Sequence, residues 1–347
     1  MILNNRQSKI LSYIDDNKEV SRKDIENFIN LTEKASKITV IRDLDILLKN
    51  GYIISTGKAR GVKYKTNNKS DVLREYNVEN YFSKDADERS VKYPQFNFDI
   101  FNKLDKIFTD SELQELDNIN KQYLNKINNL SKVALKKEFE RLLIELSWKS
   151  AKIEGNTYSL LDTEALIKDN IEAEGHKKEE AVMILNHKNA LEYIFESKQY
   201  FKKLSLKKIE ELHELLTQNM GVKRGLRTNP VGIVGTNYKP LDNQHQIKEA
   251  VERLVDLINS ISNPITKALI TVLMISYIQP FEDGNKRTGR ILANAVLYAH
   301  CYCPLSYRSV KETEYKKAVI IFYENNSLSY FKTIFTEQFK FAVEKYF

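Results

Sequence analysis

The sequence predicts a mainly α-helical protein: a small N-terminal domain of three helices and a hairpin, followed by a larger helical bundle with one β-hairpin flap. Glycine and proline are sparse, at 11 and 6 of 347 residues, and long stretches rich in Leu, Ile, Lys and Glu favour helices. A chain of this length usually forms at least two domains. We therefore expect a small domain at residues 1–68, a polar connector at 69–97 and a helical domain at 98–347.

The first 50 residues predict three helices. Apolar residues at helical spacing mark the first one, at Ile10, Leu11 and Ile14, and Ser21 is a favourable N-cap for the second. The third is expected to end at a left-handed Gly51 and to bury an apolar face made of Ile38, Ile41, Leu44, Leu47 and Leu48. The β-rich runs YIIST and VKYKT around the turn GKARG then predict a hairpin.

Three helices and a hairpin resemble the winged helix-turn-helix domains of bacterial regulators. The likeness includes the pattern T-x-x-R-D-L-x-x-L followed by K-x-G-x-I, carried here by Thr39, Arg42, Asp43, Leu44, Leu47, Lys49, Gly51 and Ile53. It implies DNA as a partner, with major-groove contacts from Lys34, Ser36, Lys37, Thr39 and Arg42. In the wing, phosphates or the minor groove would be contacted by Lys58, Arg60 and Lys63.

The charge distribution agrees with an anionic partner for this segment. Residues 1–69 hold 14 Lys and Arg against 8 Asp and Glu, so they carry a net charge of +6 out of +7 for the whole chain. The alternative is a protein-docking domain whose lysines keep the surface soluble.

No segment predicts secretion or membrane insertion. The N-terminus MILNNRQSKILSYIDDNKEV lacks an apolar core, and the most apolar run, LITVLMISYI, is shorter than the ~20 residues of a spanning helix. Cys301 and Cys303 are too close for an easy disulfide, and a lone C-x-C is a poor metal signal. A cytoplasmic protein without a membrane partner is expected.

The stretch YIQPFEDGNKRTGR, residues 277–290, carries groups suited to a polyphosphate. Proline ends the preceding apolar helix, and Gly284 and Asn285 can both take positive φ, so that their amides form an anion nest. A new helix is expected to begin near Lys286, with its positive dipole end at the same point. Arg287 and Arg290 lie three residues apart, on one face of that helix, where both could bind phosphate oxygens.

An acidic pair precedes the nest and predicts a metal ligand. Asp283, with Glu282 as the second choice, could bind Mg²⁺ bridging two phosphates. Downstream of a long helical stretch, PVGIVGTNYKPL at 230–241 alternates Val and Ile with Gly around the turn-forming GTN, which predicts a small hairpin.

These residues resemble the Fic signature H-x-F-x-[DE]-G-N-[GK]-R-x-x-R over 279–290. RGLRTNPVGIVGTNYKPL resembles the flap of that family, with Gly235, Thr236, Asn237 and Tyr238 at its turn, and LNHKNALEYI and IEELHELLTQNM resemble its earlier helices. The resemblance implies a helical bundle that transfers AMP from ATP to a hydroxyl of a target protein. The flap would align the target chain by strand addition. It places Mg²⁺ on Asp283 and the nucleotide phosphates on Gly284, Asn285, Lys286, Arg287 and Arg290.

A second motif, WKSAKIEGNTYS at 148–159, resembles the inhibitory motif [ST]-x-x-x-E-[GN] of the same family. It is carried by Ser150, Glu154 and Gly155, on an expected helix over 138–156. The resemblance implies that Glu154 reaches Arg290 and takes the place of the γ-phosphate, because a carboxylate and a phosphate compete for one guanidinium. Since both motifs are in one chain, inhibition would be intramolecular.

Two positions depart from the signature. Gln279 replaces the histidine that acts as general base, and an amide cannot accept the proton of a hydroxyl. His245, just after the flap, is the one histidine with a plausible route to the site. Lys286 replaces the glycine of most AMP-transferring members and is typical of the Doc branch, which resembles kinases that phosphorylate proteins.

Three functions stay open at this point. The first is a self-inhibited protein adenylyltransferase that tolerates Gln279. The second is a catalytically silent regulator that senses a nucleotide and binds DNA, and the third is a Doc-like phosphotransferase. A homodimer is one of the oligomeric states that the sequence leaves open.

Overall fold

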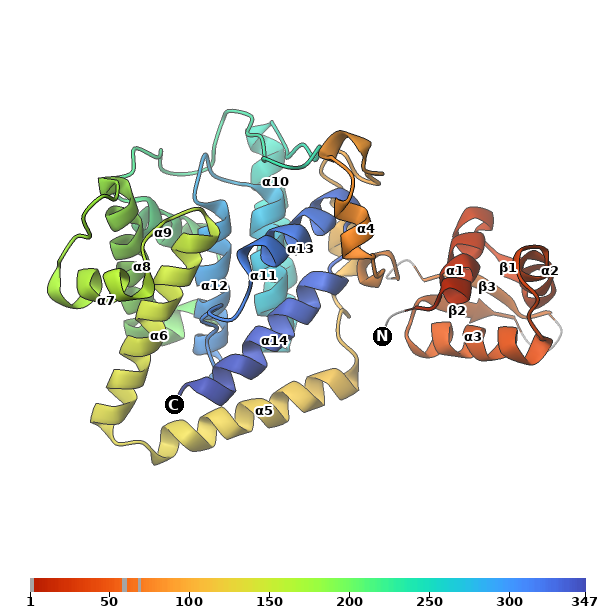
Figure 1. The fold of residues 1–347 in the computed structure, drawn as a ribbon, viewed down its shortest axis with the longest axis horizontal. Helices are drawn as coiled ribbons and strands as arrows, with labels where there is room; N and C mark the ends of the chain where they lie inside the picture. Colours follow the sequence, from red (N-terminus) through yellow and green to blue (C-terminus); the bar gives the residue numbers. More distant parts are fainter. Residues whose placement is uncertain (1–2, 58–60, 68–69) are drawn as a thin grey trace.

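The computed structural model describes residues 3–57, 61–67 and 70–347, and Figure 1 shows a large helical body with a smaller unit on its N-terminal side. The predicted mainly helical fold class is confirmed, since strands in the described ranges are confined to one small sheet of the smaller unit. Within the same ranges, no helix is both long and apolar enough to cross a bilayer.

In the smaller unit, three helices and a three-stranded antiparallel sheet surround their own hydrophobic core. The elements are α1 (Asn5–Asn17), β1 (Val20–Ser21), α2 (Arg22–Thr32), α3 (Lys37–Lys49), β2 (Ile53–Thr56) and β3 (Lys63–Thr66). β3 lies between the other two strands, and Thr56 of β2 is opposite Lys63 of β3. The predicted hairpin is therefore confirmed, whereas β1 has only two residues and gives no sequence pattern.

Capping sets the helix boundaries in this unit. Ser21 and Asp24 form a reciprocal capping box at the start of α2, and Gly51 follows α3 with a φ of +71°, as predicted. The predicted apolar face of α3 is wrong at Ile38, which is 64% exposed. The face that packs on the core runs instead through Val40, Leu44 and Leu47.

A buried carboxylate joins α1 to α3. Asp43 is 3% exposed and accepts hydrogen bonds from Arg6 Nε at 2.5 Å and from Gln7 Nε2 at 2.9 Å. Asp43 is the aspartate of the pattern T-x-x-R-D-L-x-x-L, and in this structure its role is to hold α1 and α3 together.

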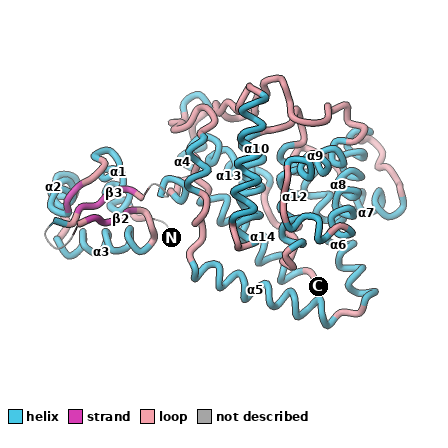
Figure 2. Tube along the Cα trace, turned by 180° about the vertical axis from the view of Figure 1, so that it is seen from behind, coloured by secondary structure: helices cyan, strands magenta, loops and turns pink. Residues whose placement is uncertain are grey.

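The large body consists of ten α-helices among the described residues and a second hydrophobic core. They are α5 (Asp110–Asn129), α6 (Lys132–Ile153), α7 (Leu160–Asp169), α8 (Lys178–Glu196), α9 (Leu206–Thr217), α10 (Gln244–Ser260), α11 (Pro264–Ile278), α12 (Asn285–Ala299), α13 (Glu312–Asn325) and α14 (Ser329–Lys345). Two 3₁₀ helices, η4 (Phe98–Lys103) and η5 (Lys198–Lys202), complete it. Figure 2 shows α5 crossing one edge of the body toward α6.

The helix pair α11 and α12 forms the centre of the body. Every residue of α11 after Pro264 is buried, as expected for the most apolar run of the sequence. A Cβ atom on Gly289 of α12 would lie 3.0 Å from the carbonyl oxygen of Val272 in α11. The glycine therefore permits the close approach that places the start of α12 beside the end of α11.

The connector between the two units is built of short helices that lie on the body. These are η2 (Ser70–Leu73), α4 (Val78–Phe82) and η3 (Ala86–Glu88). The backbone hydrogen bonds that attach it to α13 and the start of α14 run from Tyr93 N to Glu324 O and from Leu328 N to Val72 O, both at 2.8 Å. The connector is thus part of the folded body's surface.

The segment 230–241 differs from its prediction. It is an extended loop with a turn at Val234 and Gly235 and lacks a two-stranded ladder of its own in the described structure. Its one β-bridge joins Lys239 to Gln95 of the connector. The predicted regular hairpin is wrong because the connector supplies the backbone partner, and we call 230–241 the flap below.

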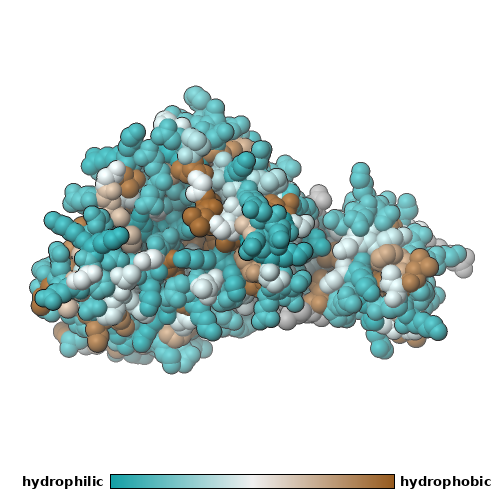
Figure 3. Space-filling model, turned by 45° about the horizontal axis from the view of Figure 1, so that its top comes forward, coloured by the Kyte–Doolittle hydropathy of each residue, from teal (hydrophilic) through white to brown (hydrophobic). Residues whose placement is uncertain are grey.

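The surface in Figure 3 is largely hydrophilic, with small groups of hydrophobic residues on both units. The most exposed of the large hydrophobic residues in the described chain is Val234 of the flap, at 96%. Leu31 and Ile38 of the smaller unit are 86% and 64% exposed.

Candidate active site

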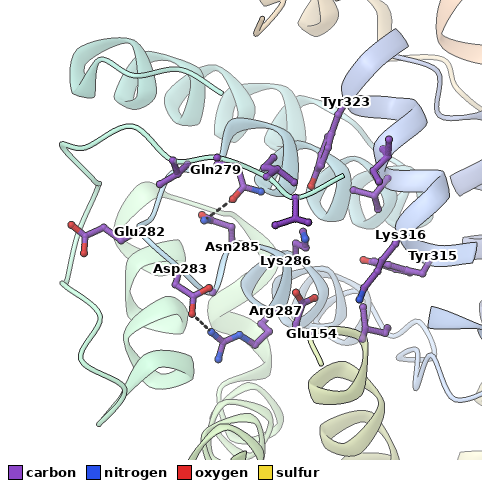
Figure 4. Close-up of a pocket in the computed structure, with 18 of the residues that line it drawn as sticks. Glu154, Gln279, Glu282, Asp283, Asn285, Lys286, Arg287, Tyr315, Lys316 and Tyr323 are labelled. Carbon is purple, nitrogen blue, oxygen red and sulfur yellow. Dashed lines mark hydrogen bonds and ion pairs between the residues drawn. The ribbon is translucent and has the colours of Figure 1, made fainter. Parts of the chain in front are cut away.

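The flap, the end of α6, the loop between α11 and α12, and α13 enclose a cavity of about 410 Å³ (Figure 4). Its polar lining comes mainly from residues of the motif at 279–290 and from α13: Gln279, Glu282, Asp283, Asn285, Lys286, Arg287, Tyr315, Lys316 and Tyr323, together with Glu154 from the end of α6. Its apolar lining includes Val231, Ile233 and Val234 of the flap. The cavity is thus large enough for a small-molecule ligand.

The loop that precedes α12 is shaped by one side chain. Asn285 Oδ1 accepts a hydrogen bond from Phe281 N at 2.8 Å, and Asn285 Nδ2 donates to Phe281 O at 2.8 Å and to Gln279 Oε1 at 2.9 Å. The prediction of positive φ at both Gly284 and Asn285 is wrong for Asn285, which is the first helical residue of α12. Its side chain folds the loop, and its contribution to an anion site is its backbone N–H.

Gly284 has the predicted positive φ, at +80°. A Cβ atom here would lie 2.9 Å from Thr217 Cγ2, so both the backbone conformation and the space require glycine. The nest therefore consists of Gly284 followed directly by the N-terminus of α12.

The opposite side of the loop is fixed by an aromatic stack. Phe281 is fully buried, and its ring lies 3.7 Å from that of His213 at an angle of 11°. His213 Nε2 is 2.9 Å from Asp283 O and must donate, because a carbonyl only accepts. Burial lowers the pKa of His213 to about 4, so it is neutral at pH 7 and holds the loop.

Gln279 lies where α11 ends, in the left-handed conformation with φ of 51°. Its Oε1 accepts from Asn285 Nδ2, and its Nε2 donates to Ser276 O at 2.5 Å. Both ends of the amide are therefore engaged in the loop, and Figure 4 shows it directed at Asn285. Gln279, which stands where the resembling family has its histidine base, is thus a structural side chain on the cavity wall.

Arg287 and Asp283 form an ion pair at the cavity edge. Arg287 is 2% exposed and its Nη2 donates to Asp283 Oδ2 at 2.8 Å, whereas the Asp283 side chain is 66% exposed. Glu282 points away from the other labelled side chains in Figure 4, and its Oε1 lies 3.9 Å from Lys223 Nζ. Of the two acids considered as metal ligands, Asp283 is the one directed at the α12 N-terminus.

Arg290 is fully buried behind the cavity wall and is held by the last turns of α6. Its Nε donates to Ser150 Oγ at 3.0 Å and its Nη2 donates to Ser150 O at 2.9 Å. His187 Nδ1 lies 2.8 Å from Met183 O and must donate, so His187 Nε2, 2.8 Å from Ser150 Oγ, accepts the serine hydroxyl. Burial lowers the pKa of His187 to about 3, which keeps this chain of hydrogen bonds in one orientation.

Glu154 covers Arg290 on the cavity side. Its Oε1 lies 2.8 Å from Arg290 Nη2, and its side chain is 19% exposed, whereas that of Arg290 is 0% exposed. Burial opposes ionisation of Glu154, but the charges of Arg290 and Lys286 outweigh it and lower the Glu154 pKa below its usual value. The carboxylate is therefore ionised at neutral pH. Gly155 follows with a φ of +103° and ends α6.

The helix expected over 138–156, which carries the motif that resembles an inhibitory motif, corresponds to α6, and α6 begins earlier, at Lys132. Of its three motif residues, Glu154 lines the cavity and Ser150 holds Arg290, while Gly155 shapes the helix end. The sequence pattern thus placed these residues beside a helix more than 120 positions downstream.

Residues of α13 were missed by the sequence reasoning. Lys316, Tyr315 and Tyr323 line the cavity, and in the described part of the chain the side-chain amines of Lys316 and Lys286 make no hydrogen bond and no ion pair. The two lysines come from opposite walls, α13 and α12 (Figure 4). Lys286 belongs to the motif at 279–290, whereas Lys316 lies outside any recognisable motif. The sequence pattern therefore offered no signal for Lys316.

Several predicted site residues lie elsewhere. His245, considered above as the one histidine with a plausible route to the site, is exposed in the first turn of α10, and the described cavity lining contains no histidine. In the flap, Gly235 and Thr236 face Arg89 and Glu324, Tyr238 is buried with its hydroxyl on Tyr277 O, and Asn237 contacts the connector.

The residues predicted to contact DNA lie on the smaller unit, away from the cavity. Lys34, Ser36, Lys37, Thr39 and Arg42 gather around the start of α3, where Ser36 also caps the helix. Lys63 is on β3 with its Nζ 3.6 Å from Glu19 Oε2. Lys58 and Arg60 lie outside the described residues.

Comparison with known proteins gives matches to one family. Residues 203–297 match the Fic/DOC family. A protein adenylyltransferase Fic of Drosophila willistoni is 27% identical over 188 residues, which cover 52% of this chain and 37% of the fly protein. That of Drosophila persimilis is 27% identical over 206 residues, covering 58% of this chain and 40% of the relative. The chain therefore spans well under half the length of these relatives.

Solved structures share the fold. Fic-1 from C. elegans superposes with a TM-score of 0.59 and 20% identity, over 68% of this chain and 70% of that one. A Fic domain-containing signalling protein from Bacteroides thetaiotaomicron has a TM-score of 0.55 and 20% identity, over 67% of this chain and 94% of the other.

Proposed function

We propose that this chain, whose residues 203–297 match the Fic/DOC family, binds ATP in the cavity and transfers AMP to a protein hydroxyl, under intramolecular inhibition by Glu154. The observation that carries the proposal is the ion pair between Glu154 Oε1 and Arg290 Nη2, 2.8 Å apart beside a helix N-terminus. A carboxylate there competes with a phosphate for the same guanidinium. The relatives described as adenylyltransferases support ATP as the nucleotide.

The start of α12 supplies the groups that would hold the phosphates. The N–H groups of Asn285, Lys286 and Arg287 occupy its first turn, where helical N–H groups have no intrahelical acceptor, and the helix dipole is positive there. Lys286 and Lys316 add two cations at the cavity. This concentration of donors and positive charge favours a polyphosphate over a neutral ligand.

Asp283 is the residue that fits Mg²⁺. Its carboxylate is 66% exposed and lines the cavity next to the phosphate-binding N–H groups. Mg²⁺ beside nucleotides is ordinarily held by one or two carboxylates, phosphate oxygens and water, so a cluster of acids is not needed. The ion would supply charge neutralisation of the phosphates.

Glu154 would restrain the enzyme through Arg290. With the carboxylate in place, the guanidinium is shared between Glu154 and Ser150 and cannot also bind a γ-phosphate. A change that removes the carboxylate frees the outward side of Arg290 while Ser150 and His187 continue to orient it. Inhibition would therefore be relieved without loss of the fold.

The transfer step itself requires a proton acceptor. The target hydroxyl oxygen bonds to the α-phosphorus of ATP, and the bond from that phosphorus to the oxygen bridging the α- and β-phosphates breaks. Pyrophosphate leaves, and the hydroxyl proton passes to solvent water. Both polar atoms of the Gln279 amide are engaged with Asn285 and Ser276. Without a general base, transfer is expected to be ~10²–10⁴-fold slower than with one.

The experiment compares wild type with Glu154→Gly and Glu154→Gln, incubated with α-labelled ATP, Mg²⁺ and cell lysate. Glutamine keeps the shape of Glu154 and removes its charge, so both variants should bind ATP more tightly and label protein more than wild type. Unchanged ATP affinity in both variants would contradict the inhibitory role of Glu154.

The engaged Gln279 favours a second candidate, a catalytically silent nucleotide sensor whose N-terminal unit binds DNA. Tight ATP binding by the Glu154→Gly variant with no labelled protein would identify this function. Repeating the incubation with γ-labelled ATP tests the phosphotransfer alternative suggested by Lys286: label from the γ-phosphate but not from the α-phosphate would identify a kinase.

A further inference from the structure

The connector and the flap meet at a buried carboxylate at the end of α13. Glu324 is 0% exposed and accepts hydrogen bonds from Tyr81 of the connector, through Oε2 at 2.6 Å, and from Thr236 of the flap, through Oε1 at 2.7 Å. Asn325 Nδ2 donates to Tyr81 Oη at 2.8 Å. Segments far apart in the sequence thus converge on one side chain.

Arg89 of the connector joins all three elements. Its Nη2 lies 2.8 Å from Glu324 Oε1 and its Nε donates to Glu324 Oε2 at 3.1 Å, which makes a two-pronged ion pair. The same Nη2 donates to the carbonyl oxygen of Gly235 in the flap. The Arg89 side chain is 5% exposed, so this geometry is shielded from solvent.

Further contacts attach only one half of the flap. Asn237 Nδ2 donates to Ala86 O at 3.0 Å, and Lys239 N donates to Pro94 O at 2.9 Å. By contrast, residues 231–234 line the cavity and make no backbone hydrogen bond to the rest of the described chain. The connector therefore holds the rear half of the flap, whereas the front half, which lines the cavity, lacks such backbone bonds in the described structure.

We propose that Arg89 and Glu324 are positioning residues that hold the flap at a fixed distance and register beside the cavity. The proposal deepens the proposed function and rests on it only for the purpose of the flap, which is to present a target chain to the nucleotide. The positioning itself is a property of the folded chain and is measurable without any transfer.

Arg89 and Glu324 hold the flap because each buried charge depends on the other for its neutralising partner. Removing the charge of Glu324 leaves Arg89 without its partner in a site closed to solvent, and Thr236 then loses a charged acceptor. The contacts that fix Gly235 and Thr236 weaken together. The N-terminus of α12 makes none of these contacts, so nucleotide binding should be insensitive to them.

The test is amide hydrogen exchange measured by mass spectrometry on the full chain. In Glu324→Gln, exchange within 230–241 is expected to rise about tenfold or more over wild type, since a charged hydrogen-bond network is lost. Thr236→Val leaves the ion pair of Arg89 and Glu324 intact and should raise flap exchange by a smaller factor, about threefold. Arg89→Lys keeps the positive charge without the fork and should behave like Glu324→Gln.

The matched control is Glu145→Gln. Glu145 is a buried carboxylate that also contacts an arginine and a tyrosine, Arg308 and Tyr346, at a place remote from the flap. The Glu145→Gln variant should have a lower melting temperature than wild type, while the amide hydrogen exchange of its flap should stay within about twofold of the wild-type rate. If Glu324→Gln leaves flap exchange unchanged, or if Glu145→Gln raises it by the same factor, the positioning role is overturned.

A second measurement separates this proposal from the proposed function. Binding of a fluorescent ATP analogue to Glu154→Gly and to the double variant Glu154→Gly with Glu324→Gln should agree within about twofold, since the phosphate site is untouched. A loss of ATP affinity as large as the rise in flap exchange would overturn a role confined to the flap. Failure of all variants to bind ATP would refute the proposed function while the exchange data still decide the positioning.

Discussion

The hydrogen bonds of Gln279 limit the chemistry of the cavity at the scale of one residue. Gln279 has φ of 51°, a left-handed conformation that histidine tolerates better than most side chains. Replacing Gln279 with histidine would substitute an imidazole, which can accept a proton near neutral pH, for an amide held by two hydrogen bonds. Asn285 would lose one of its hydrogen-bond acceptors, but it would keep both contacts with Phe281.

We therefore predict that Gln279→His in the Glu154→Gly background raises AMP transfer by ~10²–10⁴-fold. The rate should increase with pH through a value near 6.5, the ordinary pKa of histidine, which the Gln279 protein should lack. The measurement is a single-turnover transfer rate from pH 5 to 9. Equal rates and equal pH profiles for the two proteins would show that position 279 does not supply the base.

A pH prediction follows for the pair of Glu154 and Arg290. The folded-state pKa of Glu154 is lowered below 4.5, so the stability from its ionised form is fully present above the unfolded value and is lost as pH falls through the folded value. Glu154→Gln should thus lower the free energy of unfolding by about 1–3 kcal/mol between pH 5 and 8. Below pH 4.5 the difference should shrink, as urea denaturation at each pH would reveal.

At the scale of elements, the close approach of α11 and α12 is open to test. Gly289→Ala places a Cβ atom 3.0 Å from Val272 O, and the two helices must move apart. We expect a loss of about 1–3 kcal/mol in the free energy of unfolding. Gly232→Ala is the control, because its Cβ would meet nothing within 4 Å. Equal stability of the two variants would contradict the packing account.

Elements also mark where sequence reasoning succeeded. The helix α3, the hairpin of β2 and β3, and the turn into α12 were predictable because caps and glycines act locally. Ile38 was misplaced because α3 carries apolar residues on two adjacent faces, and periodicity alone does not reveal which of them packs on the core. The flap was predicted as a hairpin because its apolar residues alternate with glycine, but its one β-bridge is to the distant Gln95.

For the candidate site, the sequence indicated the residues of contiguous motifs and missed those that converge by folding. Asp283, Arg287 and Glu154 were recognisable from short patterns. Lys316 and the Arg89–Glu324 pair were not, because α13 and the connector reach the cavity region only through tertiary packing. The detailed role of Asn285 also required the hydrogen bonds that the structure provides.

At the scale of the whole molecule, the smaller unit should bind an anionic partner independently of the cavity. Lys34, Lys37 and Arg42 are exposed around the start of α3. We predict that the chain binds duplex DNA with an affinity that falls steeply with salt, and that Arg42→Ala weakens it by about tenfold. Lys49→Ala, at the other end of α3, should have less effect.

Fluorescence anisotropy at several salt concentrations, with and without ATP, measures both binding and its dependence on the cavity. Absence of DNA binding at low salt would favour the alternative of a protein-docking domain. A change in DNA affinity on adding ATP would indicate communication between the two units.

The ion pair between Glu154 and Arg290 also determines the fraction of molecules in which Arg290 is free to bind a ligand. If opening Glu154 away from the guanidinium costs about 3 kcal/mol, roughly one molecule in 150 is open at any moment, and the apparent dissociation constant for a ligand that needs Arg290 is raised by the same factor. An intrinsic micromolar affinity would then become about 0.1 mM. The strength of this one ion pair would thus set the nucleotide concentration at which half of the protein is occupied.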